Sequence, residues 1–373
     1  MSKVEWKKID EICTVLTGGD APIDCVKGQT KSTDENPYPI YSNGDDVYGF
    51  CSTYRVGTDA VTISSIGNVG SVYYRAANFT PIIRLKVVIP LTQLLDTKFL
   101  YYSLLDYSFI GTNSSLSSMK AADIKRIKIP IPALEEQNRI VGILDTFTAS
   151  IDNLKEQITQ RRKQYEYYRD QLLDLEGKDG AKNIKLENIV SQDCSLSYGI
   201  VQPGEDVFEG VPVVRPVDLI TTFVNRKGLK NTTKQISDSY KRTILKGNEI
   251  LFCVRGTTGV MSLATQSLVG CNVTRGIVPI SFDNEITKMF VYYQLKSRKL
   301  QKVIADKTNG TALKQINVKD LRQINLIIPS LSEQQRIVGI LDVFEASIQN
   351  LEAQLALREK QYEYYRNKLL TFE

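Results

Sequence analysis

The sequence predicts an α+β protein in which two similar mixed α/β domains are separated by two long helices that form an antiparallel coiled coil with pseudo-two-fold symmetry. Three observations predict this fold. A segment of about 46 residues occurs twice, at 131–176 and 328–373, with roughly 30 identical positions. Both copies have apolar residues at alternating spacings of four and three, as coiled coils do. The two segments that precede them, 1–130 and 177–327, are rich in strand-like runs and differ from each other.

Residues 1–130 are expected to form the first domain. The runs Val61–Ser64, Ser71–Arg75 and Ile82–Ile89 are β-branched or alternate in polarity, which is typical of strands. Asn/Gly turns at 41–44 and 67–70 separate them. Residues Thr97–Tyr107 are expected to form a short helix.

Residues 131–176 are expected to form the first long helix. Ile131 before Pro132 favours an extended end to the preceding strand, and no proline follows before Glu176. Ala133 cannot cap this helix with its side chain, so the cap must come from elsewhere. The predicted seam of the helix pair comprises Ile140, Leu144, Phe147, Ile151, Leu154, Arg161 and Tyr165.

Residues 177–327 are expected to repeat the plan of the first domain with different side chains. The strand-like runs here are Val211–Arg215, Glu249–Val254 and Gly276–Ile280, and Lys288–Ala305 is the expected helix. Asp123–Arg126 and Asp320–Gln323 occupy equivalent places just before the long helices. The linker at 177–180 has two glycines, which suit a turn out of the first helix.

Residues 328–373 are expected to form the second long helix, with Ser330 and Glu333 spaced as a capping box. Each helix would span on the order of 60 Å. An arginine interrupts the apolar pattern of both helices at the same place, where a polar residue can fix the register of the helix pair. Two core helices of a bundle are the alternative interpretation of this pattern. The second seam comprises Ile337, Leu341, Phe344, Ile348, Leu351, Arg358 and Tyr362.

The basic charge is concentrated in one segment. Residues 177–327 carry 22 Lys and Arg against 13 Asp and Glu, whereas residues 1–130 carry 14 against 13. The two helical segments are mildly acidic, with 6 against 9 and 5 against 7. A basic segment of this size favours a polyanion partner, because neutralising phosphates is the usual source of nucleic-acid affinity.

Composition argues against catalysis by this chain. It has no histidine, which removes Ser-His-Asp and Cys-His systems and histidine-containing metal sites. There is no GxxxxGK or GxGxxG motif, so no cofactor or metal is expected on the chain itself. The six cysteines form no CxxC pair, and neither a signal peptide nor a membrane span is evident. These features favour a cytoplasmic protein with reduced thiols.

Polar turn residues are the candidates for DNA binding. Arg and Lys pair with guanine edges, and Asn and Gln with adenine, in the major groove of duplex DNA. Any single residue of this kind is more often an ordinary solvated surface residue, so the group indicates more than any of its members. The candidates in the first domain are Ser42, Asn43, Asn68, Tyr73, Arg75, Asn113, Ser115 and Lys120. Those in the second domain are Arg215, Arg226, Lys227, Lys230, Arg242, Arg255, Thr257, Arg275, Asn309 and Lys314.

The repeated phrase Ile-Pro-x-Leu-x-Glu-Gln-x-Arg-Ile-Val-x-Ile-Leu, at 131–144 and 328–341, resembles the specificity subunit of type I restriction-modification systems. The loops Tyr38–Gly44, Gly67–Gly70 and Val254–Gly259 also resemble segments of such recognition domains. This resemblance implies two target-recognition domains, each reading one half of a split double-stranded DNA site. It also implies that the helices dock two adenine-N6 methyltransferase subunits, which carry S-adenosylmethionine. A motor-nuclease subunit would join for restriction.

Three alternatives stay open on the sequence. The chain could be the specificity subunit of another restriction or antiviral methylation architecture, because the same helices could dock different catalytic partners. It could also be a coiled-coil scaffold whose domains bind proteins instead of DNA, in which case any DNA affinity would lack the strong salt dependence of phosphate contacts. A self-sufficient enzyme is the alternative that the composition supports least.

Overall fold

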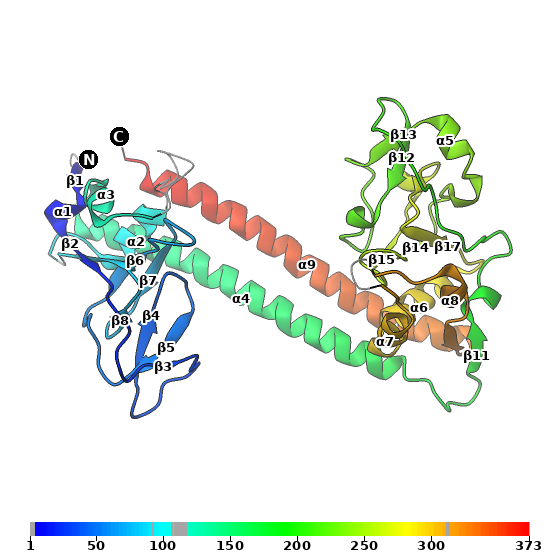
Figure 1. Ribbon diagram of the computed structural model, residues 1–373, viewed down its shortest axis with the longest axis horizontal. Helices are drawn as coiled ribbons and strands as arrows, with labels where there is room; N and C mark the ends of the chain where they lie inside the picture. The colour runs from blue at the N-terminus through cyan, green and yellow to red at the C-terminus, as the bar shows by residue number, and fades with distance from the viewer. Residues whose placement is uncertain (1–3, 92, 106, 108–117, 311–313, 373) are drawn as a thin grey trace. The chain divides into compact units, whose positions relative to one another are not determined.

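The computed structural model describes residues 4–91, 93–105, 107, 118–310 and 314–372. The chain forms two compact units, one made of Met1–Glu156 with Ala353–Glu373 and the other of Gln157–Glu352 (Figure 1). Each long helix therefore contributes one part to each unit. No helix in the described ranges is both long and apolar enough to cross a membrane.

The first unit contains two four-stranded sheets, ordered β2-β9-β6-β7 and β3-β5-β4-β8, and an antiparallel pair β1-β10. Helix α2 (Thr97–Leu105), for which the sequence predicts a helix over 97–107, packs on the first of these sheets. Helix α3 (Ala121–Lys125) precedes β10. The remaining elements are β1 (Glu5–Lys8), α1 (Ile9–Ile12), β2 (Cys13–Thr17), β3 (Val26–Lys27), β4 (Tyr38–Tyr41), β5 (Val47–Cys51), β6 (Ala60–Ile63), β7 (Val72–Arg75), β8 (Thr80–Pro81), β9 (Lys86–Pro90) and β10 (Lys128–Ile131).

One strand prediction in this unit is wrong over its first half. The run 82–89 is not continuous, because β8 ends at Pro81 and β9 begins at Lys86. Ile83 and Arg84 have φ of 52° and 59°, and their N–H groups donate to the carbonyls of residues 19 and 18 instead of a strand ladder. Tertiary hydrogen bonds to that loop override the β propensity of the run.

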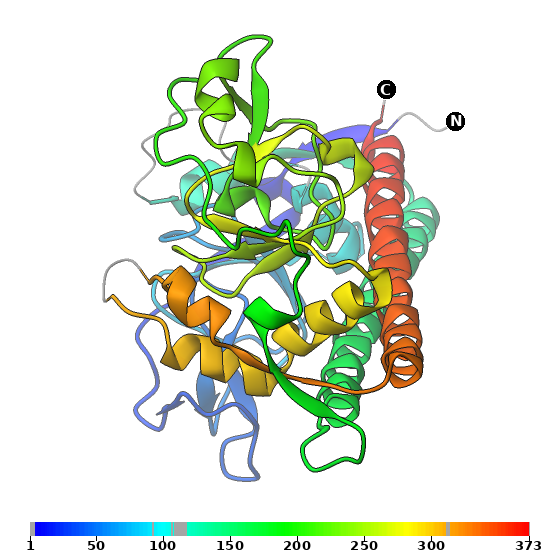
Figure 2. The same ribbon diagram turned by 90° about the vertical axis from the view of Figure 1, so that its right-hand side faces the viewer.

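The second unit repeats the plan with three-stranded sheets, β15-β14-β17 and β13-β12-β16, and the pair β11-β18. Figure 2 faces this unit, with α6 (Glu285–Lys296) and α7 (Arg298–Asp306) beside its sheets. The remaining elements are β11 (Lys182–Lys185), η1 (Leu186–Asn188), β12 (Val211–Val214), η2 (Pro216–Asp218), β13 (Lys230–Thr232), α5 (Lys234–Asp238), η3 (Lys241–Thr243), β14 (Ile250–Cys253), β15 (Met261–Leu263), η4 (Gln266–Leu268), β16 (Asn272–Val273), β17 (Ile277–Ile280), α8 (Val318–Arg322) and β18 (Asn325–Ile328).

The single helix predicted at 288–305 is in fact two helices, α6 and α7. Ser297 separates them, because its backbone is extended (φ −63°, ψ 149°). Its hydroxyl donates to the Gln294 carbonyl at 2.6 Å and accepts from the Leu300 N–H at 3.4 Å. The serine thus closes one helix and caps the next, a role that residue spacing alone does not reveal.

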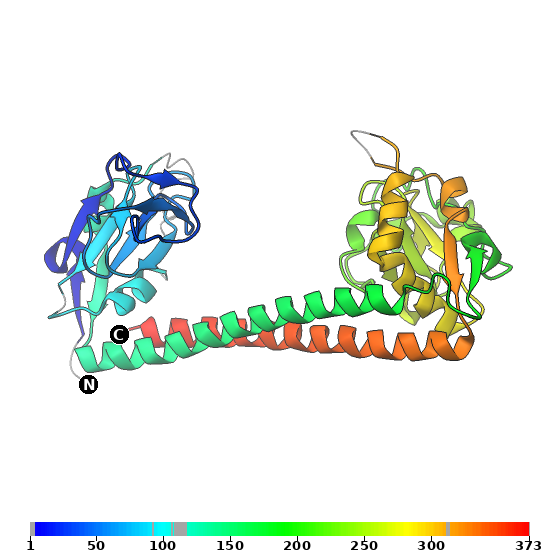
Figure 3. The same ribbon diagram turned by 90° about the horizontal axis from the view of Figure 1, so that it is seen from below.

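The long helices α4 (Leu134–Leu172) and α9 (Leu331–Leu370) pack against each other in an antiparallel manner in both units (Figure 3). In the first unit Phe147 stacks on Tyr365, with ring centroids 5.3 Å apart. In the second unit the equivalent rings, Phe344 and Tyr168, stack at 5.6 Å. The predicted antiparallel pair is therefore confirmed.

The predicted seam is buried unevenly. Ile140 and Leu144 belong to the core of the first unit, and Ile337 and Leu341 to that of the second, so these turns also anchor the domains. The Arg358 guanidinium lies 5.6 Å from the Phe147 ring centroid. The buried members are Ile140, Leu144, Ile151, Tyr165, Ile337 and Leu341, and the half-buried ones are Phe147, Leu154, Arg161, Phe344, Ile348, Leu351, Arg358 and Tyr362.

The N-termini of the two long helices are capped differently from each other, as the sequence indicates. Ser330 accepts from the Glu333 N–H at 3.4 Å, but the Glu333 carboxylate pairs with Arg336, so only one half of the predicted capping box forms. At the start of α4, the Gln137 side chain donates to the Pro132 carbonyl at 2.8 Å. The Gln334 amide makes the same bond to the Pro329 carbonyl at 2.9 Å, so this contact is common to both helix starts and does not replace the missing cap at Ala133.

Candidate nucleic-acid interface

A tight loop between two sheet strands recurs in both units and frames the candidate interface. In the second unit it joins β14 to β15, and the Gly259 N–H donates to the Cys253 carbonyl at 2.9 Å. In the first unit it joins β6 to β7, and the Gly70 N–H donates to the Ser64 carbonyl at 2.9 Å. Both loops need positive φ at two matching positions, which glycine adopts without strain. These glycines are Gly67, Gly70, Gly256 and Gly259, with φ of 73°, 88°, 87° and 89°.

In the second unit this loop borders a hollow of about 260 Å³, which we call the arginine hollow. Arg255 comes from the β14–β15 loop and Arg275 from the turn before β17. The segment after α7 closes the hollow, because the Ile316 N–H donates to the Val254 carbonyl at 3.0 Å. The lining residues are Tyr198, Val201, Val254, Arg255, Arg275, Gln315, Ile316, Asn317 and Val318.

Five predicted DNA-binding residues belong to the segments that form the arginine hollow. Arg255 is half-buried, whereas Arg275, Thr257, Asn309 and Lys314 are exposed. Backbone bonds hold the segments together: Gly256 N–H donates to the Lys314 carbonyl at 2.8 Å, and residues 309 and 315 exchange bonds of 2.8 and 2.9 Å. Guanidinium, ammonium and amide groups on one rigid edge can donate to base edges or phosphates. These residues therefore form the best-supported candidate site.

The equivalent edge of the first unit has different side chains. Ile66 and Asn68 stand where the second unit has Arg255 and Thr257, and Asn68 is exposed. The Met119 N–H donates to the Ser65 carbonyl at 2.9 Å and so places the exposed Lys120 at this edge. Two further predicted residues, Asn113 and Ser115, lie outside the described residues. The two edges share a backbone frame and differ in chemistry.

Arg75 occupies a different position from the one expected of a DNA-reading residue. Its side chain is 5% exposed and donates to the Gly44 carbonyl at 2.7 Å and the Asp45 carbonyl at 2.9 Å. The guanidinium lies 3.9 Å from the ring centroid of Tyr41 and 4.8 Å from that of Tyr73, another candidate. We therefore assign Arg75 to the scaffold of the domain, with its ring partner Tyr73.

Asn43 is a second candidate that the structure uses internally. Its amide donates to the Ile83 carbonyl and its oxygen accepts from the Ser65 N–H, both at 2.7 Å. These bonds fix the loop that follows β4, in which Ser42 is half-buried. Asn43 therefore joins three loops, and its side chain has little capacity left for a base.

The other candidates of the second unit are separate from the arginine hollow. The Arg215 guanidinium donates two hydrogen bonds to the Asp218 carboxylate, at 3.0 and 2.8 Å, and this hydrogen bonding raises the pKa of Arg215. Arg226 is exposed, and its guanidinium donates to the Ser267 carbonyl at 2.7 Å. These positions suit phosphate contacts better than base reading. Three candidates of this unit remain, and all of them are exposed: Lys227, Lys230 and Arg242.

The sequence did not point to two sets of residues at these candidate sites. Tyr198, Gln315 and Asn317 line the arginine hollow, and only the proximity of the last two to Lys314 could have suggested them. It also missed two matching hydrogen bonds between the domains and the helices, Tyr102 to Asp145 and Tyr293 to Asp342. The sequence did contain an indication of these hydrogen bonds, because an aspartate stands at the same place in both copies of the repeated helical segment.

Comparison with known proteins agrees with this description. The family described as the type I restriction modification DNA specificity domain matches residues 1–161 and 209–357. The specificity subunit of the type I restriction enzyme EcoBI from Escherichia coli is 28% identical over 290 residues, which are 70% of this chain and 61% of that protein. A second such subunit from Escherichia coli is 30% identical over 299 residues, with 72% and 71% covered.

Full-length matches also exist. A putative type I restriction enzyme specificity subunit of Haemophilus influenzae is 27% identical and is matched over 96% of its length by all of this chain. The crystal structure of a type I restriction-modification S subunit from M. genitalium has a TM-score of 0.64 at 16% identity, with 100% of this chain and 98% of that chain covered. At this identity the structural similarity concerns the fold alone.

Proposed function

The chain belongs to the specificity subunits of type I restriction-modification systems, and on that premise we propose that each unit binds one half of a split double-stranded DNA site. The observation that carries this proposal is the arginine hollow and its counterpart. The same loop frame carries Arg255 and Thr257 in one unit and Ile66 and Asn68 in the other. Two readers with one frame and different side chains are suited to two unlike sequences.

We further propose that the two long helices dock two adenine-N6 methyltransferase subunits. In support, roughly 30 of about 46 positions are identical between the helix segments, although the domains before them differ. Two such similar surfaces suit two copies of one partner. Those subunits would bring S-adenosylmethionine and the chemistry, and this chain would contribute recognition. A motor-nuclease subunit would complete the complex for restriction.

The test is to co-express the chain with the methyltransferase encoded beside it and to map N6-methyladenine across the host genome. We expect one new split motif with two specific halves around a fixed gap. The double variant R255A/R275A should relax or abolish only one half of that motif. K185A, which removes an exposed cation of β11 that is not among the candidate DNA-binding residues, is the matched control and should leave the motif unchanged.

Two results would contradict the proposal. Co-purifying proteins without new methylation would favour a scaffold or a missing component. Loss of both half-sites in R255A/R275A, with the fold intact, would contradict independent reading by the two units.

A further inference from the structure

Each unit has a hollow between its recognition domain and its long helix, and the two differ in chemistry. We call them the first hollow and the second hollow, after the unit to which each belongs. The hollow of the first unit measures about 250 Å³ and that of the second about 620 Å³. A tyrosine donates to an aspartate of the helix in both: Tyr102 to Asp145 at 2.7 Å, and Tyr293 to Asp342 at 2.5 Å. The two hollows are therefore equivalent sites of the repeated module.

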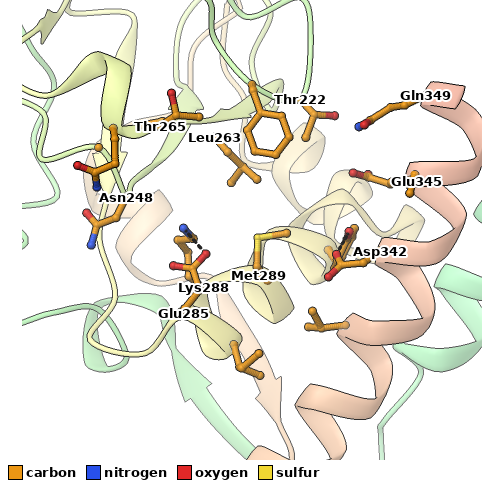
Figure 4. A pocket seen from close by; sticks show the side chains of 18 residues that line it. Thr222, Asn248, Leu263, Thr265, Glu285, Lys288, Met289, Asp342, Glu345 and Gln349 are labelled. Atoms are coloured by element: carbon orange, nitrogen blue, oxygen red, sulfur yellow. Dashed lines mark hydrogen bonds and ion pairs between the residues drawn. The ribbon is translucent and has the colours of Figure 1, made fainter. Parts of the chain in front are cut away.

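The first unit supplies its own cation at this site. Lys98, one helical turn before Tyr102, places its ammonium 2.5 Å from the second carboxylate oxygen of Asp145. In the second unit the residue one helical turn before Tyr293 is Met289. Figure 4 shows Met289 and Asp342 among the residues that line the second hollow. Within the described ranges no Lys or Arg forms an ion pair with Asp342. Among the described residues, the second hollow therefore has no cation at Asp342 equivalent to Lys98 at Asp145.

Part of the wall of the second hollow is apolar. Leu263, Met289 and Phe223 line it, and Phe223 is 50% exposed. The backbone around Phe223 is fixed, because the Leu263 N–H donates to the Thr222 carbonyl at 2.7 Å and the Val224 N–H donates to the Leu263 carbonyl at 3.3 Å. The second hollow therefore presents apolar surface in a fixed position, against which the aliphatic stem of a long side chain can pack.

The charges of the second hollow argue against DNA as its occupant. Its two other carboxylates already have cations: Glu285 pairs with Lys288 at 2.7 Å, and Glu345 pairs with Lys296 at 2.9 Å. Asp342 adds a carboxylate without a cation, which would repel phosphate. A side chain with an apolar stem and a cationic head would satisfy both the walls and Asp342, and lysine and arginine have this form.

We propose that the second hollow receives a lysine or arginine side chain of the methyltransferase subunit docked on the second module, whereas Lys98 closes the equivalent site of the first module. This inference rests on the proposed docking of two such subunits. It implies that two identical partners bind this chain unequally. The copy at the second module gains an ion pair and apolar contacts that the other copy cannot make.

The test is to titrate the full chain with the methyltransferase subunit by isothermal calorimetry, with native mass spectrometry to count the bound copies. The wild-type chain should bind two copies in two distinguishable steps. M289K supplies the missing cation from within and fills the hollow, so it should weaken the tighter step about tenfold. D342N should weaken the same step, whereas its matched control D145N should not.

The outcomes separate this inference from the proposal on which it rests. If the wild-type chain binds no methyltransferase, the docking proposal fails and this inference fails with it. If two copies bind and both steps are unchanged in M289K and D342N, docking stands and the inference is overturned. Circular dichroism of each variant confirms that a weakened step does not reflect unfolding.

Discussion

Replacing Arg75 with alanine separates a scaffolding role from a base-reading role. The substitution leaves the Gly44 and Asp45 carbonyls without the charged donor that reaches them at 2.7 and 2.9 Å, and it removes the cation from the rings of Tyr41 and Tyr73. The Asp45 carboxylate is 75% exposed, so its ion pair adds little. The buried hydrogen bonds and ring contacts together should cost roughly 3–5 kcal/mol of unfolding free energy.

The assay can report on the first unit alone. Trp6 is the single tryptophan of the chain and lies in β1 of that unit. Its fluorescence should therefore follow the unfolding of this unit. In urea, the unit should unfold at a lower denaturant concentration in R75A than in the wild-type chain. On heating, the melting temperature of the unit should fall by roughly 10 °C in R75A. R55A is the matched control, because Arg55 is exposed and its guanidinium donates only one described hydrogen bond, to the Asp20 carbonyl.

A different result would refute the scaffold assignment. If R75A unfolds at the same urea concentration as R55A but no longer recognises the first half-site, Arg75 acts on DNA directly. In that case its buried position would have to change on binding.

Three further predictions concern the helices and the first unit. F147A and F344A should destabilise their units by similar amounts, about 2–3 kcal/mol, because each removes an equivalent ring stack; clearly unequal losses in thermal unfolding would contradict that equivalence. Burial raises the pKa of Cys13 to about 12, so iodoacetamide at pH 8 should leave it unmodified in the folded chain. Because this folded pKa lies above the unfolded one, the thiol contributes stability that is complete below about pH 9 and is lost as pH rises towards 12; C13V should reduce that alkaline loss in urea unfolding. Inserting seven residues at equivalent points of both helices should lengthen the gap of the methylated motif and preserve its halves, and an unchanged gap would refute a spacing role.

The helical part of the fold was readable from the sequence because its information is local and periodic. The repeated phrase and the alternating spacing of four and three define both long helices and their antiparallel packing, which Phe147 on Tyr365 and Phe344 on Tyr168 confirm. Strand runs at 60–63 and 72–75 were equally visible. Errors arose where tertiary hydrogen bonds override propensity, as at residues 83–84, or where one side chain divides a helix, as at Ser297.

The site depended on tertiary structure for a physical reason. Composition and turn chemistry identified a pool of polar residues, but the role of each depends on groups far away in the sequence. The partners of Arg75 lie 30 and 31 residues before it, and the arginine hollow joins segments near 198, 255, 275 and 316. Sequence by itself determined two modules, two long helices and a basic second domain. Only the tertiary structure decided which cations are buried and which meet at one edge. It also decided that Lys98 pairs with Asp145, whereas no described lysine or arginine pairs with Asp342.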